Sequence, residues 1–339
     1  MKLYLLPKQG TFFKANLHCH SNLSDASLSP KAIKEMYRAR GYSIIAFSDH
    51  DIFIPHPELE DESFLPLNAF EVEINSQTNN AAYMKTCHLT MIALNPETQI
   101  QPCFHREKYH VCNAVKHKDL VCFDESLPDY EREYSPERIN DMIANFKAGG
   151  FYVTYNHPTW SLENYNDYIQ YNGMDAMEIC NFGSYKMGFA EYNDRVYDDM
   201  LRSGKHIFCS AADDNHNGAP ENTYFFDSFG GFVMIKADKL EYRTITKALE
   251  RGNFYSSSGP EIHELYVEDN RVYITFSPSV RVTMTTACRH TEVKYADPGL
   301  TITSADFPIH KDDGYIRLTV YDSVGHPAYT NAYFLNDFI

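Results

Sequence analysis

The feature that most constrains the fold is an alternation of short apolar runs with amphipathic segments over about the first 250 residues. The apolar runs are rich in β-branched and aromatic residues, as strands are. Two amphipathic segments begin with a Ser-Pro pair, at Ser29-Pro30 and Ser135-Pro136, where serine caps a helix and proline occupies its first turn. A third helix is expected to end at Gly252. This alternation predicts an α/β fold with a mostly parallel sheet.

Two stretches break the alternation. Residues 95–134 are polar and mixed, and we interpret them as an insertion that is a candidate lid over a site. After residue 258 the pattern changes to period-two runs separated by turn residues, which is typical of antiparallel strands. The chain of 339 residues is long enough for a large domain with a small appendage. We therefore predict a first domain over residues 1–258 and a small β-sandwich-like domain over residues 259–339.

Charge and composition narrow the classes of partner. The chain has 46 acidic and 30 basic residues, so its formal net charge is −16. This charge repels nucleic acid and anionic lipid, and we expect neither a long duplex nor a membrane as partner. The N-terminus offers only four consecutive apolar residues before Pro7, too few for a signal peptide, and the eight cysteines form no Cys-x-x-Cys pair. We therefore expect a cytoplasmic protein whose cysteines are mostly buried free thiols.

Side chains that can bind metal recur along the apolar runs. In "NLHCHSNLSD", His18 and His20 lie on one face of a strand because strand side chains alternate between faces. Core packing explains one such pair equally well. The recurrence favours a metal site, because His, Asp and Glu are unfavourable at so many strand ends that feed a core. The other candidate ligands are Asp25, His50, Glu71, His88, His157, Asp214 and His216.

These side chains are expected to meet, because the carboxyl ends of parallel strands in a barrel lie on one face. The mixture of imidazole and carboxylate groups suits Zn, Mn or Fe. The candidates are too numerous for the four to six contacts of one such ion, so at least two ions are implied. Glu71 is the natural bridge between them, since a carboxylate has two oxygens.

The motifs "NLHCHSNLSD", "GYSIIAFSDHD", "LNAFEVEI", "YNHP" and "SAADDNHN" together resemble those of the PHP (polymerase and histidinol phosphatase) family of metal-dependent phosphoesterases. The resemblance covers about residues 10–258, in the correct order. It implies a distorted (β/α)7 barrel that holds two or three divalent ions. The segment "GHPAYTNAYF" is similar to the C-terminal module of stand-alone, two-domain members.

The resemblance also implies which residues share an ion. The chain departs from the family at Ala26 and Ala69, where members often have glycine. Glu73 and Asp213 are alternative ligands, each close in sequence to an implied one. The implied sets are His18, His20, Glu71 and Asp214 for one ion; Glu71, His88 and His157 for a second; and Asp25, His50 and His216 for a third.

These observations predict a phosphoesterase that hydrolyses a phosphate ester of a small molecule or nucleotide with a metal-bridging hydroxide. Glu71, Asp214 and His216 are its expected catalytic residues. Lys186 and Arg195 are candidate phosphate-binding residues, because an anionic substrate on an acidic protein needs local cations. Two alternatives stay open, namely an amidohydrolase-type C–N bond hydrolase and a non-enzymatic metal- or ligand-binding module. The sequence indicates no oligomeric state.

Overall fold

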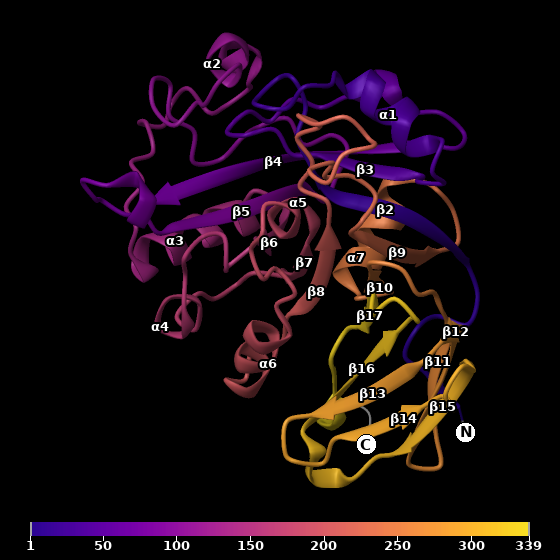
Figure 1. Cartoon of the computed structure of the whole chain (residues 1–339). Helices are drawn as coiled ribbons and strands as arrows, with labels where there is room; N and C mark the ends of the chain where they lie inside the picture. The colour runs from indigo at the N-terminus through magenta and orange to yellow at the C-terminus, as the bar shows by residue number, and fades with distance from the viewer. Residues whose placement is uncertain (1, 338–339) are drawn as a thin grey trace.

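One large mixed β-sheet organises the molecule (Figure 1). The structure is a computed structural model that describes residues 2–337. The sheet has 14 strands in the order β14-β13-β16-β17-β10-β9-β2-β3-β4-β5-β6-β7-β8, with β18 paired to β16. The strands that surround the candidate site are β2 (Thr11–Cys19), β3 (Ile44–Phe47), β4 (Leu65–Asn75), β5 (Thr86–Ala93), β6 (Phe151–Tyr155), β7 (Ala176–Asn181), β8 (Phe208–Ala212), β9 (Phe232–Ala237) and β10 (Phe254–Ser257).

The predicted (β/α)7 barrel, with its mostly parallel sheet, is wrong. Strands β2, β3 and β4 are parallel, as are β6, β7 and β8, but β5 runs antiparallel to both of its neighbours and β9 runs antiparallel to β2. Within residues 2–337, β8 does not pair with β2 as a strand. Only an isolated bridge joins Cys19, at the end of β2, to Asn215, which follows β8, so the sheet does not close into a barrel. A parallel connection needs about a dozen or more residues, usually a helix. Residues 76–85, which join β4 to β5, hold only the short 3-10 helix η2 (Ala81–Tyr83), so they form a hairpin connection.

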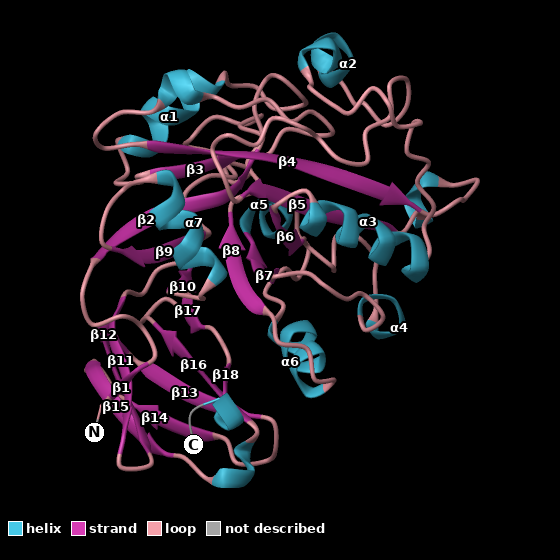
Figure 2. Cartoon of the chain, turned by 180° about the vertical axis from the view of Figure 1, so that it is seen from behind, coloured by secondary structure: helices cyan, strands magenta, loops and turns pink. Residues whose placement is uncertain are grey.

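Helices cover part of this sheet (Figure 2). The predicted starts of two helices are confirmed: the side chain of Ser29 accepts a hydrogen bond from Ala32 N, and that of Ser135 accepts one from Arg138 N. No helix among residues 2–337 is long and apolar enough to cross a membrane. The helices are α1 (Pro30–Arg38), α2 (Ala114–His117), α3 (Pro136–Ala148), α4 (Tyr165–Tyr168), α5 (Phe182–Lys186), α6 (Asp194–Arg202) and α7 (Tyr242–Glu250).

The C-terminal strands pair antiparallel and enclose a core of their own, which includes Leu265, Ile274, Phe307 and Leu318. They also continue the large sheet, because β17 pairs with β10. Arg317 joins this part to α6 through contacts of 2.8 and 3.0 Å with the carboxylate of Asp198. The boundary at residue 258 stays a prediction. β1 (Leu3–Tyr4), near the N-terminus, pairs antiparallel with β11. The C-terminal strands are β11 (Ile262–Glu268), β12 (Arg271–Ser279), β13 (Arg281–Thr286), β14 (Glu292–Tyr295), β15 (Ile302–Pro308), β16 (Tyr315–Tyr321), β17 (Pro327–Thr330) and β18 (Tyr333–Phe334).

All eight cysteines are free thiols, as expected, but only half of them are buried. The buried ones lie on or beside strands of the large sheet, whereas Cys112 and Cys122 are exposed in the insertion and Cys288 is exposed in the C-terminal part.

Candidate metal centre

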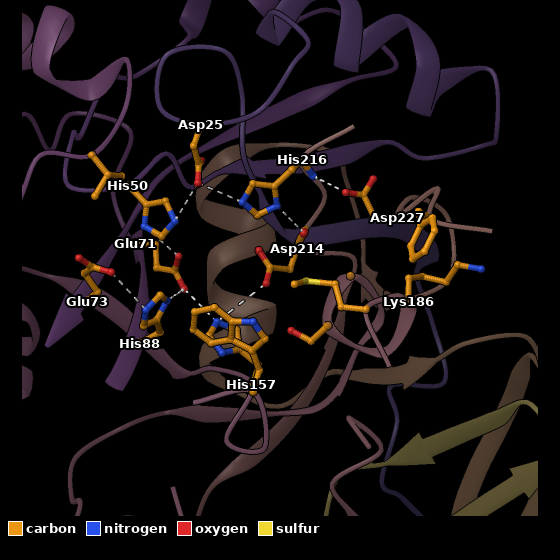
Figure 3. A pocket seen from close by; sticks show the side chains of 16 residues that line it. Asp25, His50, Glu71, Glu73, His88, His157, Lys186, Asp214, His216 and Asp227 are labelled. Carbon is orange, nitrogen blue, oxygen red and sulfur yellow. Dashed lines mark hydrogen bonds and ion pairs between the residues drawn. The ribbon is translucent and has the colours of Figure 1, made fainter. Parts of the chain in front are cut away.

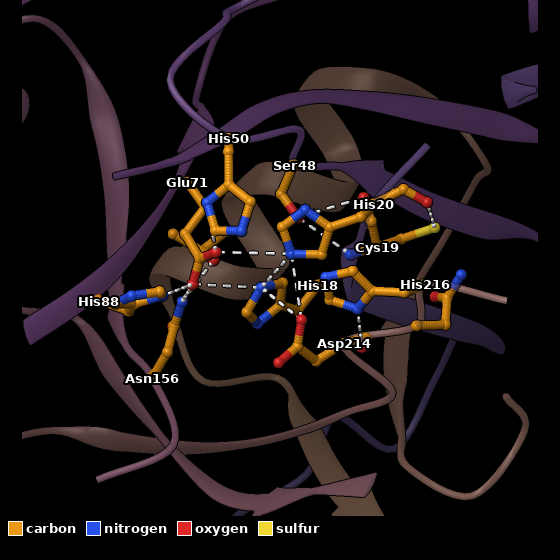
Figure 4. Close-up of polar contacts among 12 residues, drawn as sticks. His18, Cys19, His20, Ser48, His50, Glu71, His88, Asn156, Asp214 and His216 are labelled. Carbon is orange, nitrogen blue, oxygen red and sulfur yellow. Dashed lines mark hydrogen bonds and ion pairs between the residues drawn. The ribbon is translucent and has the colours of Figure 1, made fainter. Parts of the chain in front are cut away.

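The nine candidate ligands lie together in one cluster (Figures 3 and 4). They come from the ends of β2, β3, β6 and β8, the loop after β2, the middle of β4 and the beginning of β5. His88 lies near the start of its strand, because β5 runs antiparallel to β4. The expectation that every ligand follows a parallel strand is therefore wrong, although the antiparallel hairpin still brings His88 to the same place.

Glu71 is the centre of this cluster. Its side chain is 1% exposed, and its Oε1 accepts a 2.6 Å hydrogen bond from Asn156 Nδ2. Five imidazoles surround the two carboxylate oxygens. The distances to ring nitrogens are 3.3 Å for His18, 3.1 Å for His88 and 3.5 Å for His157 from Oε1, and 3.4 Å for His20 and 3.2 Å for His50 from Oε2.

His18, His20 and Asp214 form the most compact group. The two Nε2 atoms lie 3.1 Å apart, and Asp214 Oδ1 lies 3.2 Å from the first and 3.1 Å from the second. Ligand atoms about 2 Å from a tetrahedral zinc ion would be ~3.3 Å apart, so this spacing fits a shared ion. Asp214 has a φ of 50° and His157 a φ of 23°, values uncommon for residues other than glycine. Backbone strain of this kind often accompanies functional sites.

A second group surrounds Asp25. Its carboxylate oxygens lie 3.6 Å from His20 Nδ1, 3.5 Å from His50 Nε2 and 3.3 Å from His216 Nε2. The four residues offer ligand atoms that all lie within 4.8 Å of one another. This group includes the set that the family resemblance implies for a third ion.

The remaining implied set is arranged differently. The compact group around Glu71 and His88 is completed by His50, with all three ligand atoms within 4.8 Å of one another. His157 Nε2 lies 3.5 Å from Glu71 Oε1 and 3.9 Å from Asp214 Oδ2, between the first group and this one.

Unpaired polar atoms support metal binding in this cluster. Among residues 2–337, His20 Nδ1, His50 Nδ1 and His88 Nε2 are buried ring nitrogens without a hydrogen-bond partner, although a Glu71 oxygen lies 3.2 Å from His50 Nδ1 and a Glu73 oxygen 3.7 Å from His88 Nε2. Leaving such an atom unpaired costs about 1–3 kcal/mol. A divalent ion coordinated by these nitrogens would remove that cost, so the donor set fits bound ions.

The pKa shifts of the clustered side chains also support metal binding. Burial opposes protonation of its histidines, yet nearby carboxylates raise the pKa of His88 to about 10 and that of His216 to about 9. Burial and the adjacent His20 lower the pKa of His50 to about 4. Burial raises the pKa of Glu71, but the surrounding histidines hold it well below its ordinary value. Nearby carboxylates also raise the pKa of His18 well above its ordinary value. The excess negative charge thus keeps protons on three imidazoles, and divalent ions would displace such protons on binding.

Glu178 is a further candidate residue of the site, which no sequence motif marks. It lies on β7, is 1% exposed, and its Oε1 is 2.7 Å from His18 Nδ1. Its Oε2 accepts hydrogen bonds from His157 N at 3.0 Å and Asn181 Nδ2 at 2.8 Å. A carboxylate on the far nitrogen of a histidine orients the ring for a metal. The signal was an acid inside the apolar run "MDAMEICNF".

The two alternative ligands lie in different surroundings. Asp213 accepts hydrogen bonds from Tyr37 Oη at 2.8 Å and from three consecutive backbone N–H groups at residues 229–231, so both of its oxygens are occupied. Glu73 lines the cavity, with Oε2 3.7 Å from His88 Nε2, and can bind an ion at its edge.

A cavity of about 440 Å³ opens over the cluster, large enough for a small molecule. Its walls include the apolar side chains of Trp160, Met187 and Phe225. Lys186 also lines it, with Nζ 4.2 Å from the ring centre of Tyr224. Arg195 is not among the lining residues; its side chain is 83% exposed on α6, where it pairs with Asp199.

The insertion reaches the site. Val111 lines the cavity, and Asn113 N donates a 2.8 Å hydrogen bond to Ser24 O in the loop that carries Asp25. Arg132 forms a buried ion pair with Asp51, next to His50 in the sequence. The insertion therefore supports the loops that hold two candidate ligands.

Three solved structures resemble the chain. A two-domain protein from Bacteroides vulgatus containing a predicted PHP-like metal-dependent phosphoesterase is 13% identical, with 97% of this chain and 98% of that chain covered and a TM-score of 0.45. A protein from Bifidobacterium adolescentis, named by inference as a metal-dependent phosphoesterase, is 16% identical over 64% of this chain and 91% of that chain, with a TM-score of 0.37. An amidohydrolase from Chromobacterium violaceum, with bound sulfate and no metal, is 15% identical over 60% of this chain and 87% of that chain, with a TM-score of 0.37.

No family model and no curated protein matches the sequence. Similarity this remote assigns no activity to the chain, so the function is argued from the cluster itself.

Proposed function

We propose that this chain is a metal-dependent phosphoesterase that hydrolyses a phosphate ester of a small molecule or nucleotide. The observation that carries the proposal is the buried carboxylate of Glu71, with ring nitrogens of five histidines 3.1–3.5 Å from its two oxygens. A carboxylate in such surroundings can bridge two ions, and paired ions are typical of phosphoester hydrolysis. Two or three ions of Zn, Mn or Fe suit the donor set.

Bound divalent ions would lower the pKa of a water molecule and neutralise charge on the phosphoryl group. The side chains of the chain itself do the rest. Glu71 and Asp214 would hold the ions. His216 is the ligand-type residue that a substrate meets first, because 37% of its side chain is exposed where it lines the cavity. With two bound ions and none in the group around Asp25, it is our candidate donor of a proton to the leaving group.

The cavity also suits an organic phosphate. Lys186 supplies a cation where the formal net charge of the chain is −16. Trp160 and Phe225 offer aromatic surface for the organic part of the substrate, including a nucleobase. The acidic surface disfavours a long duplex, and a small phosphorylated molecule is therefore the proposed partner.

The test uses protein stripped of metal and then loaded separately with Zn, Mn or Fe. Phosphate release is measured from an aryl monophosphate, an aryl phosphodiester and a panel of nucleoside monophosphates. The proposal requires metal-dependent release from at least one of them, and loss of that release in Asp214→Ala. Loaded protein that releases phosphate from none would refute the proposal.

The same protein distinguishes the main alternative. A C–N hydrolase would release ammonia or amine from a panel of cyclic and acyclic amides while releasing no phosphate. Many C–N hydrolases use a carboxylated lysine to bridge their two metal ions, whereas Glu71 would be the bridging ligand here. If the loaded protein hydrolysed neither kind of bond, a binding module would be the better account.

A further inference from the structure

A second group of metal-binding side chains lies in the C-terminal strands, apart from the cluster around Glu71. His290 lies in the turn between β13 and β14, and His310 and Asp313 lie in the connection between β15 and β16. One ligand atom from each of the three lies within 4.8 Å of the others. The two imidazole rings are stacked with centroids 4.1 Å apart, and His290 Nδ1 is 2.8 Å from Asp313 Oδ1.

The group combines a buried carboxylate with an unpaired ring nitrogen. Asp313 is 1% exposed, and its Oδ2 accepts a 2.8 Å hydrogen bond from His310 N. Among the described residues, His290 Nε2 is a buried nitrogen with no hydrogen-bond partner, although Glu292 Oε1 is 3.5 Å away. Local contacts explain part of this arrangement, because the His290–Asp313 pair accounts for one ring nitrogen and a capping box links His310 and Asp313 across the 3-10 helix Lys311–Asp313. Neither contact accounts for the unpaired Nε2 of His290.

A thiol completes the set of donors. Cys288 Sγ is 3.7 Å from Asp313 Oδ1 and accepts a 3.4 Å hydrogen bond from the backbone N of His290. Ligand atoms around tetrahedral zinc are ~3.3–3.7 Å apart, for bonds of about 2.0–2.3 Å. The 3.7 Å spacing to Asp313 fits a shared ion, but the thiol lies outside the group whose ligand atoms are all within 4.8 Å of one another, so the Cys288 side chain would have to turn toward the two rings on binding.

We propose that His290, His310, Asp313 and Cys288 bind one Zn²⁺ ion as a structural site. Two imidazoles, a thiolate and a carboxylate form a set of nitrogen, sulfur and oxygen ligands that binds zinc in preference to Mg or Ca. Four protein ligands leave no open position for a substrate, which distinguishes this site from a catalytic one. The ion would tie the β13–β14 turn to the β15–β16 connection and stabilise the C-terminal sheets.

The first test compares zinc binding by the wild-type chain and His310→Gln. His310 is exposed, so the variant is expected to fold, and His263→Gln removes another exposed histidine as a matched control. After dialysis against a weak chelator, elemental analysis should find one zinc ion fewer per chain in His310→Gln and no change in His263→Gln. Equal zinc content in all three proteins would overturn the proposal.

Two further measurements separate this site from the cluster around Glu71. Zinc should raise the midpoint of thermal unfolding of Asp214→Ala, whose C-terminal site is intact, but raise it less when His310→Gln is added. Cobalt-loaded wild-type protein should show a thiolate-to-cobalt charge-transfer band that Cys288→Ser lacks. Equal zinc-induced shifts in the single and double variants, or a band unchanged in Cys288→Ser, would contradict the assigned ligands.

Discussion

Replacing Glu178 by glutamine changes one atom, and the structure predicts how that change weakens metal binding. The carboxylate contacts His18 Nδ1 through Oε1 and two N–H groups, of His157 and Asn181, through Oε2. Glutamine offers one oxygen and one NH₂ group. If the NH₂ group faced the two N–H groups, two buried donors would lose their acceptor, at about 1–3 kcal/mol each. The NH₂ group should therefore face His18.

That orientation reverses the tautomer of the histidine. His18 Nδ1 would accept a hydrogen bond from the amide, so its proton would move to Nε2, the atom that faces His20 and Asp214. A protonated Nε2 cannot bind an ion. Restoring the right tautomer costs one buried hydrogen bond, about 1–3 kcal/mol, which agrees with the ~10–100-fold loss of affinity typical of such changes.

The assay is a competition titration against a chromogenic chelator that reports the affinity for each ion. Glu178→Gln should bind one ion per chain ~10–100-fold more weakly than the wild type and keep its far-ultraviolet circular dichroism. Glu163→Gln makes the same substitution at another buried glutamate, whose hydrogen-bond partners are tyrosine hydroxyls, and should bind metal as the wild type does. The reasoning fails if Glu178→Gln binds every ion normally, or if Glu163→Gln weakens binding to the same extent.

Three further predictions concern other residues. Asp214→Ala should lose at least one bound ion together with phosphate release, and full metal content with full turnover would contradict its assignment. Burial raises the pKa of Glu163 from its ordinary 4.5 to about 7, so the folded state keeps a proton that the unfolded chain releases. Glu163 should then contribute a fall of about 3 kcal/mol to the free energy of unfolding as pH rises from about 4.5 to about 7. Glu163→Gln should remove this contribution and so flatten the pH dependence of urea unfolding relative to the wild type, and an unchanged pH dependence would refute it. Lys186→Ala should raise KM for a phosphate substrate ~10-fold or more, the value of a lost charge-assisted contact, whereas Arg195→Ala should leave steady-state kinetics unchanged; the reverse result would exchange their roles.

The candidate ligands were visible in the sequence because each belongs to a short local motif. His18 and His20 alternate on one strand, and Asp214 and His216 follow another, so spacing alone marked them as candidates. Which of these ligands lie next to one another depends on the directions of the strands, and the spacing of residues in the sequence does not indicate strand direction. The hairpin of β4 and β5 places His88 beside His50 and Glu71, a grouping that a parallel barrel does not predict.

The prediction of a closed barrel was wrong for a related reason. Apolar runs look alike whether the strand is parallel or antiparallel, so the pattern of runs does not show which connections are helical crossovers and which are hairpins. The length of residues 76–85 was the available evidence for a hairpin. The role of Arg195 stays a prediction, because its position in the sequence does not say which face of α6 it occupies and its side chain is exposed there. Glu178 acts through a contact 160 positions away in the sequence, and no local pattern reveals such a pairing.

The most direct test of the central claim is anomalous diffraction from crystals loaded with zinc or manganese, recorded at the absorption edge of the metal. The account predicts two or three strong peaks inside the buried cluster, with the carboxylate of Glu71 in contact with at least two of them. Crystals in which these side chains are well ordered, but no anomalous peak lies within the cluster, would contradict it.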